Sequence, residues 1–337
     1  MTDRPRLLIT MGDVAGIGPE IIAKAWPALN DLCRPVVVGD PDWMRRAVTL
    51  VKSTTSVREI RDPGEGKPDS QSIPCLLASE QDLSQVQPGH VSAAAGKAAY
   101  DFLCMAIDQT LAGAADGIVT APLHKEGLRA AGLPYPGHTE ILAERTGTRQ
   151  FAMMLYCNGL SGADRSLGVI HVTLHMALRD VFRYLNREAV LEKIRLLDDM
   201  LSRLLGRRPR IGVAGLNPHA SDGGLFGNEE ASIIQPAVED AKDEGIAASG
   251  PWPSDTLFVR ARDGEFDGLV VMYHDQGHIA LKLLGGRRAV NISVGLPIVR
   301  TSVAHGTAYD IAGKGVADPS SLIEATRVAA KLVISNQ

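Results

Sequence analysis

The stretch DGLVVMYHDQGHIALKLL, Asp267–Leu284, places an apolar run directly before a cluster of polar and ionisable side chains. The run Gly268–Met272 is short and aliphatic, which is typical of a strand covered on both faces. It ends abruptly in Tyr-His-Asp-Gln-Gly-His. Because ligands bind beyond the carboxyl ends of strands in open α/β sheets, we expect this strand to deliver His274 to a binding site.

The same alternation of short apolar runs and longer amphipathic segments extends along the chain. The expected strands are Arg6–Thr10, Pro35–Gly39, Gly117–Ala121, Phe151–Tyr156, Leu167–Leu174, Arg210–Leu216, Gly268–Tyr273 and Val290–Val294. The expected helices are Pro19–Leu29, Ala93–Ala112, Thr139–Thr146, Glu188–Leu205, Glu229–Glu244 and Pro319–Ile334. This alternation favours largely parallel sheets with helices on both sides. The polar segment Ser56–Gln87 is predicted to be an irregular surface excursion, and the sequence leaves open whether it contains short strands.

The composition indicates a globular protein of two lobes. The 337 residues are 45% hydrophobic and 22% charged, which is enough to bury a large core without disulfides. The net charge of -4 excludes an overall positive field, so neither nucleic acid nor membrane is expected as a partner. The four cysteines form no CxxC pair, which favours reduced thiols. With no signal peptide and no apolar run of membrane-spanning length, a soluble cytoplasmic protein is expected.

Three of the expected strands are followed by a histidine: His175 in HVTLH, His219 in NPHASDGG and His274 in YHDQGH. A single histidine at a strand end is commonly a hydrogen-bonded loop residue. Three at equivalent positions can converge, because the strands of one sheet bring their carboxyl ends together. Three neutral imidazoles with one open position suit a catalytic divalent ion such as zinc.

Other ionisable residues near these histidines have less specific interpretations. Asp222, Asp255 and Asp275 are candidates for further oxygen ligands, or for hydrogen bonds that orient the imidazoles. His274 and His278 form an HxxxH pair, but no glutamate follows the first histidine, so the metalloprotease motif is absent.

The loop MGDVAGIGPE, Met11–Glu20, follows the first expected strand. It lacks the GxGxxG pattern of a standard Rossmann fold. Pro19 suits the first position of a helix, and Glu20 suits its first turn. The glycines leave two interpretations open: a plain tight turn, or a close approach of the backbone to a substrate or cofactor.

Several residues after other strands suit the binding of an anion. His138 and Thr139 precede an expected helix, where Thr139 is a candidate cap and the pair is a candidate phosphate or carboxylate site. Lys282, Asn291 and Arg300 each follow or end an apolar run. Together they would form an anion pocket, whereas singly each is an ordinary surface charge or turn residue.

Six blocks of the sequence together resemble the 4-hydroxythreonine-4-phosphate dehydrogenase family, in the order of that family. They are MGDVAGIGPE, PGHTE, NPHASDGG, YHDQGH, VNISVGLPIVRTS and HGTAYDIAGKG, and they span Met11–Gly315. The last block is also similar to the dinucleotide-binding segment of isocitrate and isopropylmalate dehydrogenases. The resemblance implies a two-lobed α/β fold of mostly parallel sheets flanked by helices, like that of isocitrate dehydrogenase and unlike a standard Rossmann fold.

The resemblance also implies how functions are distributed along the chain. Residues 1–130 and 285–337 would form an outer lobe with the nucleotide-binding segment, and residues 131–284 a central lobe with the dimer interface and the metal ligands. The implied metal ligands are His175, His219 and His274, completed in relatives by a ligand from the other subunit. The implied substrate-binding residues are His138, Thr139, Lys282, Asn291 and Arg300. The implied cofactor-binding residues are His305, Gly306, Thr307 and Asp310.

The implied activity is the metal- and NAD(P)-dependent oxidation, with decarboxylation, of a 4-phosphorylated 3-hydroxy acid by a homodimer. In the family this is the conversion of 4-hydroxythreonine 4-phosphate to 3-amino-2-oxopropyl phosphate in pyridoxal phosphate biosynthesis. The blocks APLHKEG and YHDQGHIALKLLG are more similar to catabolic relatives that oxidise 4-phospho-D-threonate or 4-phospho-D-erythronate. Val14 replaces the proline usual in the first block, which alters loop stiffness more than chemistry. The exact substrate stays open.

In the implied mechanism a divalent ion (zinc, magnesium or cobalt) stabilises negative charge on the substrate, and the nicotinamide accepts a hydride. Lys282 and Asp255 are the candidates for the general base. The choice between NAD and NADP as cofactor is left open. A metal-dependent hydrolase and a non-catalytic sugar-phosphate binding protein are the alternatives. The block HGTAYDIAGKG argues against the hydrolase, and the three histidines argue against a protein that only binds.

Overall fold

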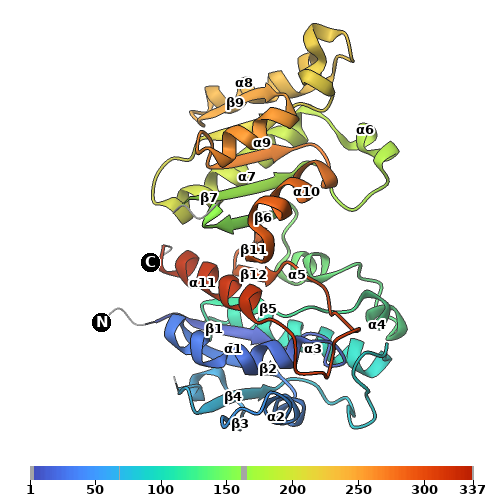
Figure 1. The fold of residues 1–337 in the computed structure, drawn as a ribbon, viewed down its shortest axis with the longest axis vertical. Helices are drawn as coiled ribbons and strands as arrows, with labels where there is room; N and C mark the ends of the chain where they lie inside the picture. The colour runs from blue at the N-terminus through green and yellow to red at the C-terminus, as the bar shows by residue number, and fades with distance from the viewer. Residues whose placement is uncertain (1–3, 68, 161–164, 336–337) are drawn as a thin grey trace. The chain divides into compact units, whose positions relative to one another are not determined.

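The computed structural model describes residues 4–67, 69–160 and 165–335. The chain divides into two compact units, the first made of Met1–Arg149 with Leu296–Gln337 and the second of Gln150–Gly295. In each unit helices flank a sheet with mostly parallel strands, so the predicted α/β fold class is confirmed (Figure 1). The lobe limits predicted from sequence, after residues 130 and 284, stay a prediction.

The first unit contains a parallel sheet. Its strands are β1 (Arg6–Thr10), β2 (Arg34–Gly39), β3 (Ser56–Ile60), β4 (Ser72–Leu77), β5 (Gly117–Thr120) and β12 (Val299–Val303). They lie in the order β3-β4-β2-β1-β5-β12, and every neighbouring pair is parallel. The central strand β1 buries Leu7, Leu8 and Ile9 completely, as its continuous apolar run predicts. Strands β3 and β4 lie in the segment Ser56–Gln87, for which the sequence leaves short strands open, whereas β12 was not predicted because VRTSV contains no such run.

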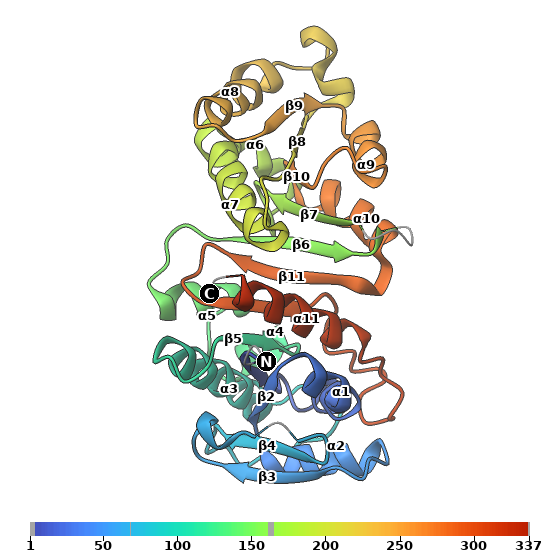
Figure 2. The same cartoon turned by 90° about the vertical axis from the view of Figure 1, so that its left-hand side faces the viewer.

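Helices cover both faces of this sheet. They are α1 (Gly18–Leu32), α2 (Pro41–Leu50), α3 (Ala93–Leu111), α4 (Lys125–Ala130), α5 (His138–Thr146) and α11 (Ser320–Ile334). Helices α1 and α11 pack together on one face, and α3 packs on β1 and β2 from the other (Figure 2). Pro19 is the second residue of α1, one position later than predicted and still within the first turn. Short polar caps start other helices; for example, the Asp40 carboxylate accepts a hydrogen bond from the backbone N–H of Trp43 at 2.8 Å.

The second unit contains a mixed sheet. Its strands are β6 (Ala152–Asn158), β7 (Ser166–His171), β8 (Ile211–Ala214), β9 (Ala248–Trp252), β10 (Gly268–Val271) and β11 (Ala289–Val294). They lie in the order β11-β6-β7-β10-β8-β9. Strand β6 is antiparallel to both β11 and β7. The neighbouring pairs β7–β10, β10–β8 and β8–β9 are parallel. The carboxyl ends of β7, β10 and β8 therefore lie along one edge of this sheet.

The helices of the second unit are α6 (Val181–Tyr184), α7 (Arg187–Leu205), α8 (Gln235–Asp243), α9 (Ser254–Arg262) and α10 (His274–Gly285). Helix α7 covers one face of the sheet, and α9 and α10 cover the other (Figure 2). The stripe predicted for α7 is confirmed, since Val190, Ile194, Leu197, Leu201 and Leu204 are all buried. The sequence did not predict α10, because its first turn is made of His, Asp and Gln rather than of periodic apolar residues.

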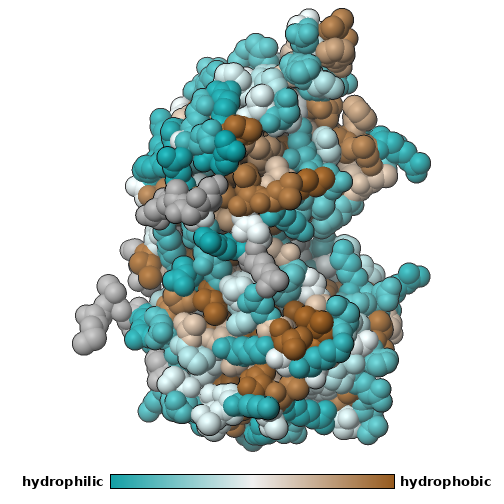
Figure 3. Space-filling view, in the orientation of Figure 1, coloured by the Kyte–Doolittle hydropathy of each residue, from teal (hydrophilic) through white to brown (hydrophobic). Residues whose placement is uncertain are grey.

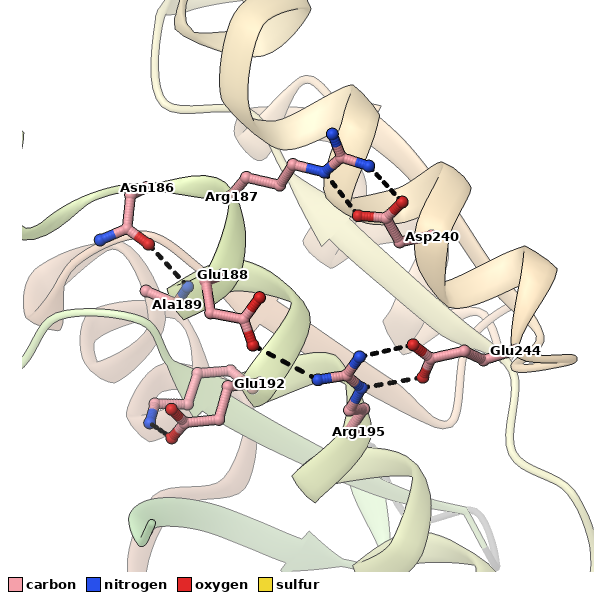
Figure 4. A network of polar contacts seen from close by, with 9 residues as sticks. Asn186, Arg187, Glu188, Ala189, Glu192, Arg195, Asp240 and Glu244 are labelled. Atoms are coloured by element: carbon pink, nitrogen blue, oxygen red, sulfur yellow. Dashed lines mark hydrogen bonds and ion pairs between the residues drawn. The ribbon is translucent and has the colours of Figure 1, made fainter. Parts of the chain in front are cut away.

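Ion pairs join α7 to α8 on the surface of the second unit (Figure 4). The Arg187 Nε donates to Asp240 at 2.5 Å, and the Arg195 Nε donates to Glu244 at 2.8 Å. Each guanidinium meets its carboxylate through two nitrogens, which fixes the orientation of the pair. Exposed pairs of this kind contribute only about 0.2–1 kcal/mol each. The buried stripe of α7 therefore provides most of the packing energy.

Cys33, Cys75, Cys104 and Cys157 are free thiols, and burial raises the pKa of Cys33 to about 12, so that thiol is unreactive at neutral pH. Among the helices that the structure describes, none is both long enough and apolar enough to cross a bilayer.

A buried carboxylate, Asp267, anchors the start of β10. It accepts hydrogen bonds from Arg207 at 2.9 and 3.0 Å and from the backbone N–H of Arg210 at 2.8 Å. Burial alone would raise the pKa of Asp267, but these hydrogen bonds together with the Arg210 side chain hold it well below its usual range. The carboxylate is therefore ionised in the folded chain across the physiological range.

Replacing Asp267 with asparagine is expected to lower the free energy of unfolding by about 2 kcal/mol at pH 7, because charged hydrogen bonds are lost. The lowered pKa means that this stabilisation is present above the pKa of the unfolded chain, about 4, and declines as the pH falls below it. Urea unfolding at pH 7 and pH 3 measures both. Asp263→Asn, which changes an exposed carboxylate beside Arg262, is the control. An Asp267 effect of equal size at both pH values would contradict the assignment.

Candidate functional site

The three histidines predicted as metal ligands follow three neighbouring strands of the second unit. His175 lies four residues beyond His171, the last residue of β7, and His274 is the first residue of α10, after β10. His219 follows β8. Because β10 lies between β7 and β8, these positions share one edge of the sheet. The ring centroids of His175 and His274 are 5.7 Å apart.

His219 lies in a segment of unusual backbone conformation. Residues 219–223 all have positive φ, and of these only Gly223 adopts such angles without cost. Each of the others costs on the order of 1 kcal/mol, and such strain is concentrated at functional sites. The backbone N–H groups of Leu216 and Asn217, just before the segment, donate hydrogen bonds to the buried Glu230 carboxylate at 2.8 and 2.7 Å. Sequence reasoning missed Glu230, which sits within a helical pattern.

The donor chemistry of this edge suits a divalent ion. His175 and His219 are exposed and His274 is partly exposed, and neutral imidazole is a common ligand for zinc and other transition metals. Within residues 4–67, 69–160 and 165–335, no group of three or more His, Cys, Asp or Glu side chains is already arranged around a metal position. The structure thus brings His175 and His274 together, and the complete ligand set stays a prediction.

The YHDQGH motif builds this edge residue by residue. The Asp275 carboxylate lies 2.7 Å from His274 Nδ1, which leaves Nε2 as the ring nitrogen for other contacts. The Gln276 amide ties strand ends together: its Oε1 accepts from the Met272 N–H at 2.6 Å, and its Nε2 donates to the Gly215 carbonyl at 2.7 Å. A side chain at Gly277 would meet the ring of His171 at 2.5 Å, so only glycine lets α10 pack this closely on β7.

Two further histidines pack beside His274: His278 contacts its ring, and His171 contacts His278. His278 Nδ1 and His171 Nε2 are 3.0 Å apart, and the His278 ring stacks on His274 with centroids 3.8 Å apart. Burial, reinforced by neighbouring imidazoles, lowers the pKa of His278 to about 4 and that of His171 to about 3, so both are neutral at pH 7. The sequence interpretation placed His171 inside a longer strand; in the structure β7 ends at this residue. The four-residue spacing on one helix face was the available signal for His278.

The remaining predicted residues of the second unit lie in α9, α10, β11 and the left-handed segment 219–223. Asp255 lies exposed in the first turn of α9, next to Ser254, whose hydroxyl accepts from Gln276. Lys282 is exposed two turns along α10 from His274 and contributes a positive charge near His278. Asn291 is half-buried in the middle of β11, opposite Leu155 of β6. Asp222 is exposed within the left-handed segment.

In the first unit the structure brings His138 and Arg300 together. His138 is the first residue of α5 and Thr139 the second, so Thr139 is not the cap; Gly137 occupies that position. Arg300 is buried in β12 and donates to the Thr120 hydroxyl at 2.6 Å. Burial and then the charge of Arg300 lower the pKa of His138 well below its usual range. A neutral imidazole, a buried guanidinium and a helix N-terminus thus meet, which suits an anion.

The segment predicted to bind a dinucleotide packs against the Met11–Glu20 loop. His305, Gly306 and Asp310 are exposed, while Thr307 is buried and its carbonyl accepts from the Ile17 N–H at 3.0 Å. A side chain at Gly16 would meet Thr307 at 2.9 Å. The close approach that the Gly16 position permits is therefore to the protein's own backbone.

Glu20, which the sequence placed only in a first helical turn, anchors the same loop further on. Its carboxylate accepts from the backbone N–H groups of Gly315 at 3.2 Å and Ala317 at 2.6 Å. Lys24 donates to the carbonyls of the same two residues, at 2.8 and 2.7 Å. A pocket of about 290 Å³ lies beside this loop, lined by Val14, Gly16, Pro19, Glu20, Trp43, Arg46, Ala47, Leu50, Pro88 and Gly313.

Comparison with known proteins identifies the family. The sequence matches the family model described as pyridoxal phosphate biosynthetic protein PdxA over residues 31–329. It is 47% identical to the 4-hydroxythreonine-4-phosphate dehydrogenase of Beijerinckia indica, covering 99% of this chain and 96% of that one, and 46% identical to the D-threonate 4-phosphate dehydrogenase of Cupriavidus necator, covering 97% of each. The crystal structure of 4-hydroxythreonine-4-phosphate dehydrogenase from Klebsiella pneumoniae matches with a TM-score of 0.85 at 41% identity, covering 98% of this chain and 99% of that one.

These relatives are dehydrogenases, which agrees with the enzyme class predicted from the sequence. The chain belongs to the family of the pyridoxal phosphate biosynthetic protein PdxA, as its six sequence blocks indicate.

Proposed function

We propose that the chain oxidises a 4-phosphorylated 3-hydroxy acid with NAD or NADP and one divalent ion per subunit, and that decarboxylation follows oxidation. The observation that carries this proposal is the placement of His175, His219 and His274 after three neighbouring parallel strands. The family relationship supports it, since relatives at 46–47% identity act on 4-hydroxythreonine 4-phosphate or D-threonate 4-phosphate by name.

Different residues of the chain would bind the substrate and transfer the proton. His138, Thr139 and Arg300 would hold an anionic group, because a buried guanidinium and a helix N-terminus both favour negative charge. Lys282 and Asn291 would contribute further polar contacts to the substrate. Lys282 or Asp255 would take the alcohol proton. When bound, the divalent ion would polarise the alcohol oxygen and the nicotinamide would accept hydride.

The dinucleotide would lie along His305, Gly306, Thr307 and Asp310. Three of these residues are exposed, and the backbone beneath them is held by Thr307. The neighbouring pocket of about 290 Å³ is at the lower end of the size range of small-molecule sites. It is large enough for one ring system of a dinucleotide.

Two classes of substrate, one biosynthetic and one catabolic, fit this proposal. The first is 4-hydroxythreonine 4-phosphate, whose oxidation would produce 3-amino-2-oxopropyl phosphate for pyridoxal phosphate biosynthesis. The alternative is 4-phospho-D-threonate or 4-phospho-D-erythronate of a catabolic pathway, favoured by the APLHKEG and YHDQGHIALKLLG blocks. Formation of reduced nicotinamide, followed by absorbance with each compound, each dinucleotide and zinc, magnesium or cobalt, decides between them. No reduced nicotinamide with any combination would overturn the proposal.

A metal-dependent hydrolase is the alternative of another class, since a metal held by three histidines also activates water. The same assay separates the two activities. A hydrolase would release inorganic phosphate without any requirement for NAD or NADP, whereas the proposed enzyme would consume dinucleotide and release carbon dioxide.

We also propose that the active form is a homodimer formed through the second unit. Large apolar side chains are exposed around α6 and along α10 (Figure 3): Met176, Leu178, Phe182, Tyr184, Ile279 and Leu283. Helix α6 lies on an extension that projects from the body of this unit (Figure 1). Contiguous exposed apolar surface commonly marks a protein interface. Light scattering should give twice the chain mass of 35.9 kDa, and Phe182→Glu should shift it toward the monomer. A monomeric wild-type mass would contradict the dimer.

A further inference from the structure

Asp13 is a fully buried carboxylate in the loop after β1, and the proposed chemistry makes no use of it. Its Oδ1 accepts a hydrogen bond from the backbone N–H of Ala15 at 2.8 Å. Its Oδ2 accepts one from the hydroxyl of Tyr309 at 2.8 Å. Burial raises the pKa of Asp13, and the Tyr309 hydrogen bond opposes that effect. A carboxylate buried this deeply is costly unless it is hydrogen-bonded, so Tyr309 and Asp13 depend on each other.

Tyr309 is also held from a third loop. The ring of His124, which follows β5, stacks on the Tyr309 ring with centroids 4.4 Å apart and planes 11° apart. His124 is fixed in turn as the cap of α4, since its Nδ1 accepts from the backbone N–H of Gly127 at 3.4 Å. Loops that follow β1, β5 and β12 therefore meet at one side chain.

The backbone around Tyr309 is strained and exposed, so contacts made by the Tyr309 side chain are needed to keep its conformation. Ala308, its neighbour, has a φ of 46°, which costs a residue other than glycine on the order of 1 kcal/mol. His305, Gly306 and Asp310 are exposed, and a side chain at Gly306 would meet no atom within 4 Å. The exposed positions are thus displayed on a backbone that would relax if Tyr309 were released.

We propose that Asp13, Tyr309 and His124 form a positioning cluster that keeps His305–Asp310 in the conformation that binds the dinucleotide. The cluster rests on the proposed function, in which this segment binds NAD or NADP. The later part of the loop has separate anchors, because Glu20 holds Gly315 and Ala317. Loss of the Tyr309 hydroxyl therefore loosens the binding segment without releasing the whole loop.

Tyr309→Phe tests the cluster in the full-length protein. The dissociation constant for reduced dinucleotide, measured by fluorescence titration, should rise about 10-fold or more, in line with the loss of one hydrogen bond to a charged group. The KM for the phosphorylated substrate should change less than about 2-fold. Asp13→Asn should act in the same direction, and the double variant should lose little more than either alone because the two groups act as a pair. His124→Asn keeps a cap for α4 but removes the ring, and should give a smaller loss.

Amide hydrogen exchange adds a measurement that does not depend on the dinucleotide. In Tyr309→Phe, exchange should increase at residues 305–310 and stay at the wild-type level at residues 315–317. Tyr100→Phe, which removes a hydroxyl from a half-buried tyrosine on α3 of the same unit, is the matched control. Wild-type dinucleotide affinity and exchange in Tyr309→Phe would overturn the cluster while leaving the proposed function intact. A wild-type chain that binds neither NAD nor NADP would overturn the proposed function, even if the exchange result held.

Discussion

Replacing His274 with alanine is expected to abolish binding of the proposed divalent ion and to lower kcat/KM by about 1,000-fold or more. His274 begins α10 at the end of the central strand β10, and its ring lies 5.7 Å from that of His175. Loss of one of three imidazole ligands would forfeit several kcal/mol of charge stabilisation on the reacting oxygen. Metal content after dialysis, measured by atomic absorption, and formation of reduced nicotinamide are the two readouts.

His90→Ala is the matched control for this change. His90 is an exposed histidine of the first unit, where its Nδ1 lies 3.0 Å from the Pro88 carbonyl, and it should keep both metal and activity. If His274→Ala kept wild-type metal content and activity, His274 would have to be withdrawn from the ligand set.

Replacing Arg300 with methionine is expected to raise the KM for the phosphorylated substrate about 100-fold. The guanidinium is buried beside Thr120, so its positive charge acts on a bound anion with little screening by water. Truncating one partner of a buried charge pair costs about 2–5 kcal/mol of binding. Methionine keeps an unbranched apolar stem and has no charge, which limits the loss of packing that accompanies the loss of charge. Steady-state kinetics with varied substrate at saturating dinucleotide measures the effect.

Two further variants make the Arg300 result specific. Arg300→Lys keeps the charge but not the planar fork, and should fall between wild type and methionine. Arg327→Met, on the exposed side of α11, should leave KM unchanged. A thermal melt excludes simple unfolding of the methionine variant. An unchanged KM in a folded Arg300→Met protein would show that the anion binds elsewhere.

Much of the fold could be predicted because the central strands of each sheet are continuous apolar runs. The predicted limits of β1 are confirmed, and those of β2 and β5 differ by one residue at one end. Edge strands and polar helices could not be predicted in this way. Strand β3 is largely exposed and α10 starts with ligand-type residues, so neither carries the apolar period on which the prediction depends.

Supporting residues were harder to predict than residues with obvious chemistry. Glu20 and Glu230 lie within helical patterns in the sequence and look like ordinary solvated charges. In the structure both are buried and accept hydrogen bonds from loop backbone, a role that depends on which loop lies beside them. The Asp13–Tyr309 contact joins residues 296 positions apart, and no local pattern could indicate it.

The sequence by itself determined the family, the alternation of strands and helices, and the kind of side chain at each strand end. These follow from local composition and spacing, which act over a few residues. Only the tertiary structure decided that β10 lies between β7 and β8, which makes His175, His274 and His219 neighbours along one edge. Strand order depends on backbone pairing between segments far apart in the chain and on how helices cover the resulting sheet. That is why YHDQGH could be recognised from its residues, while its contacts with His171, Gly215 and Ser254 could not.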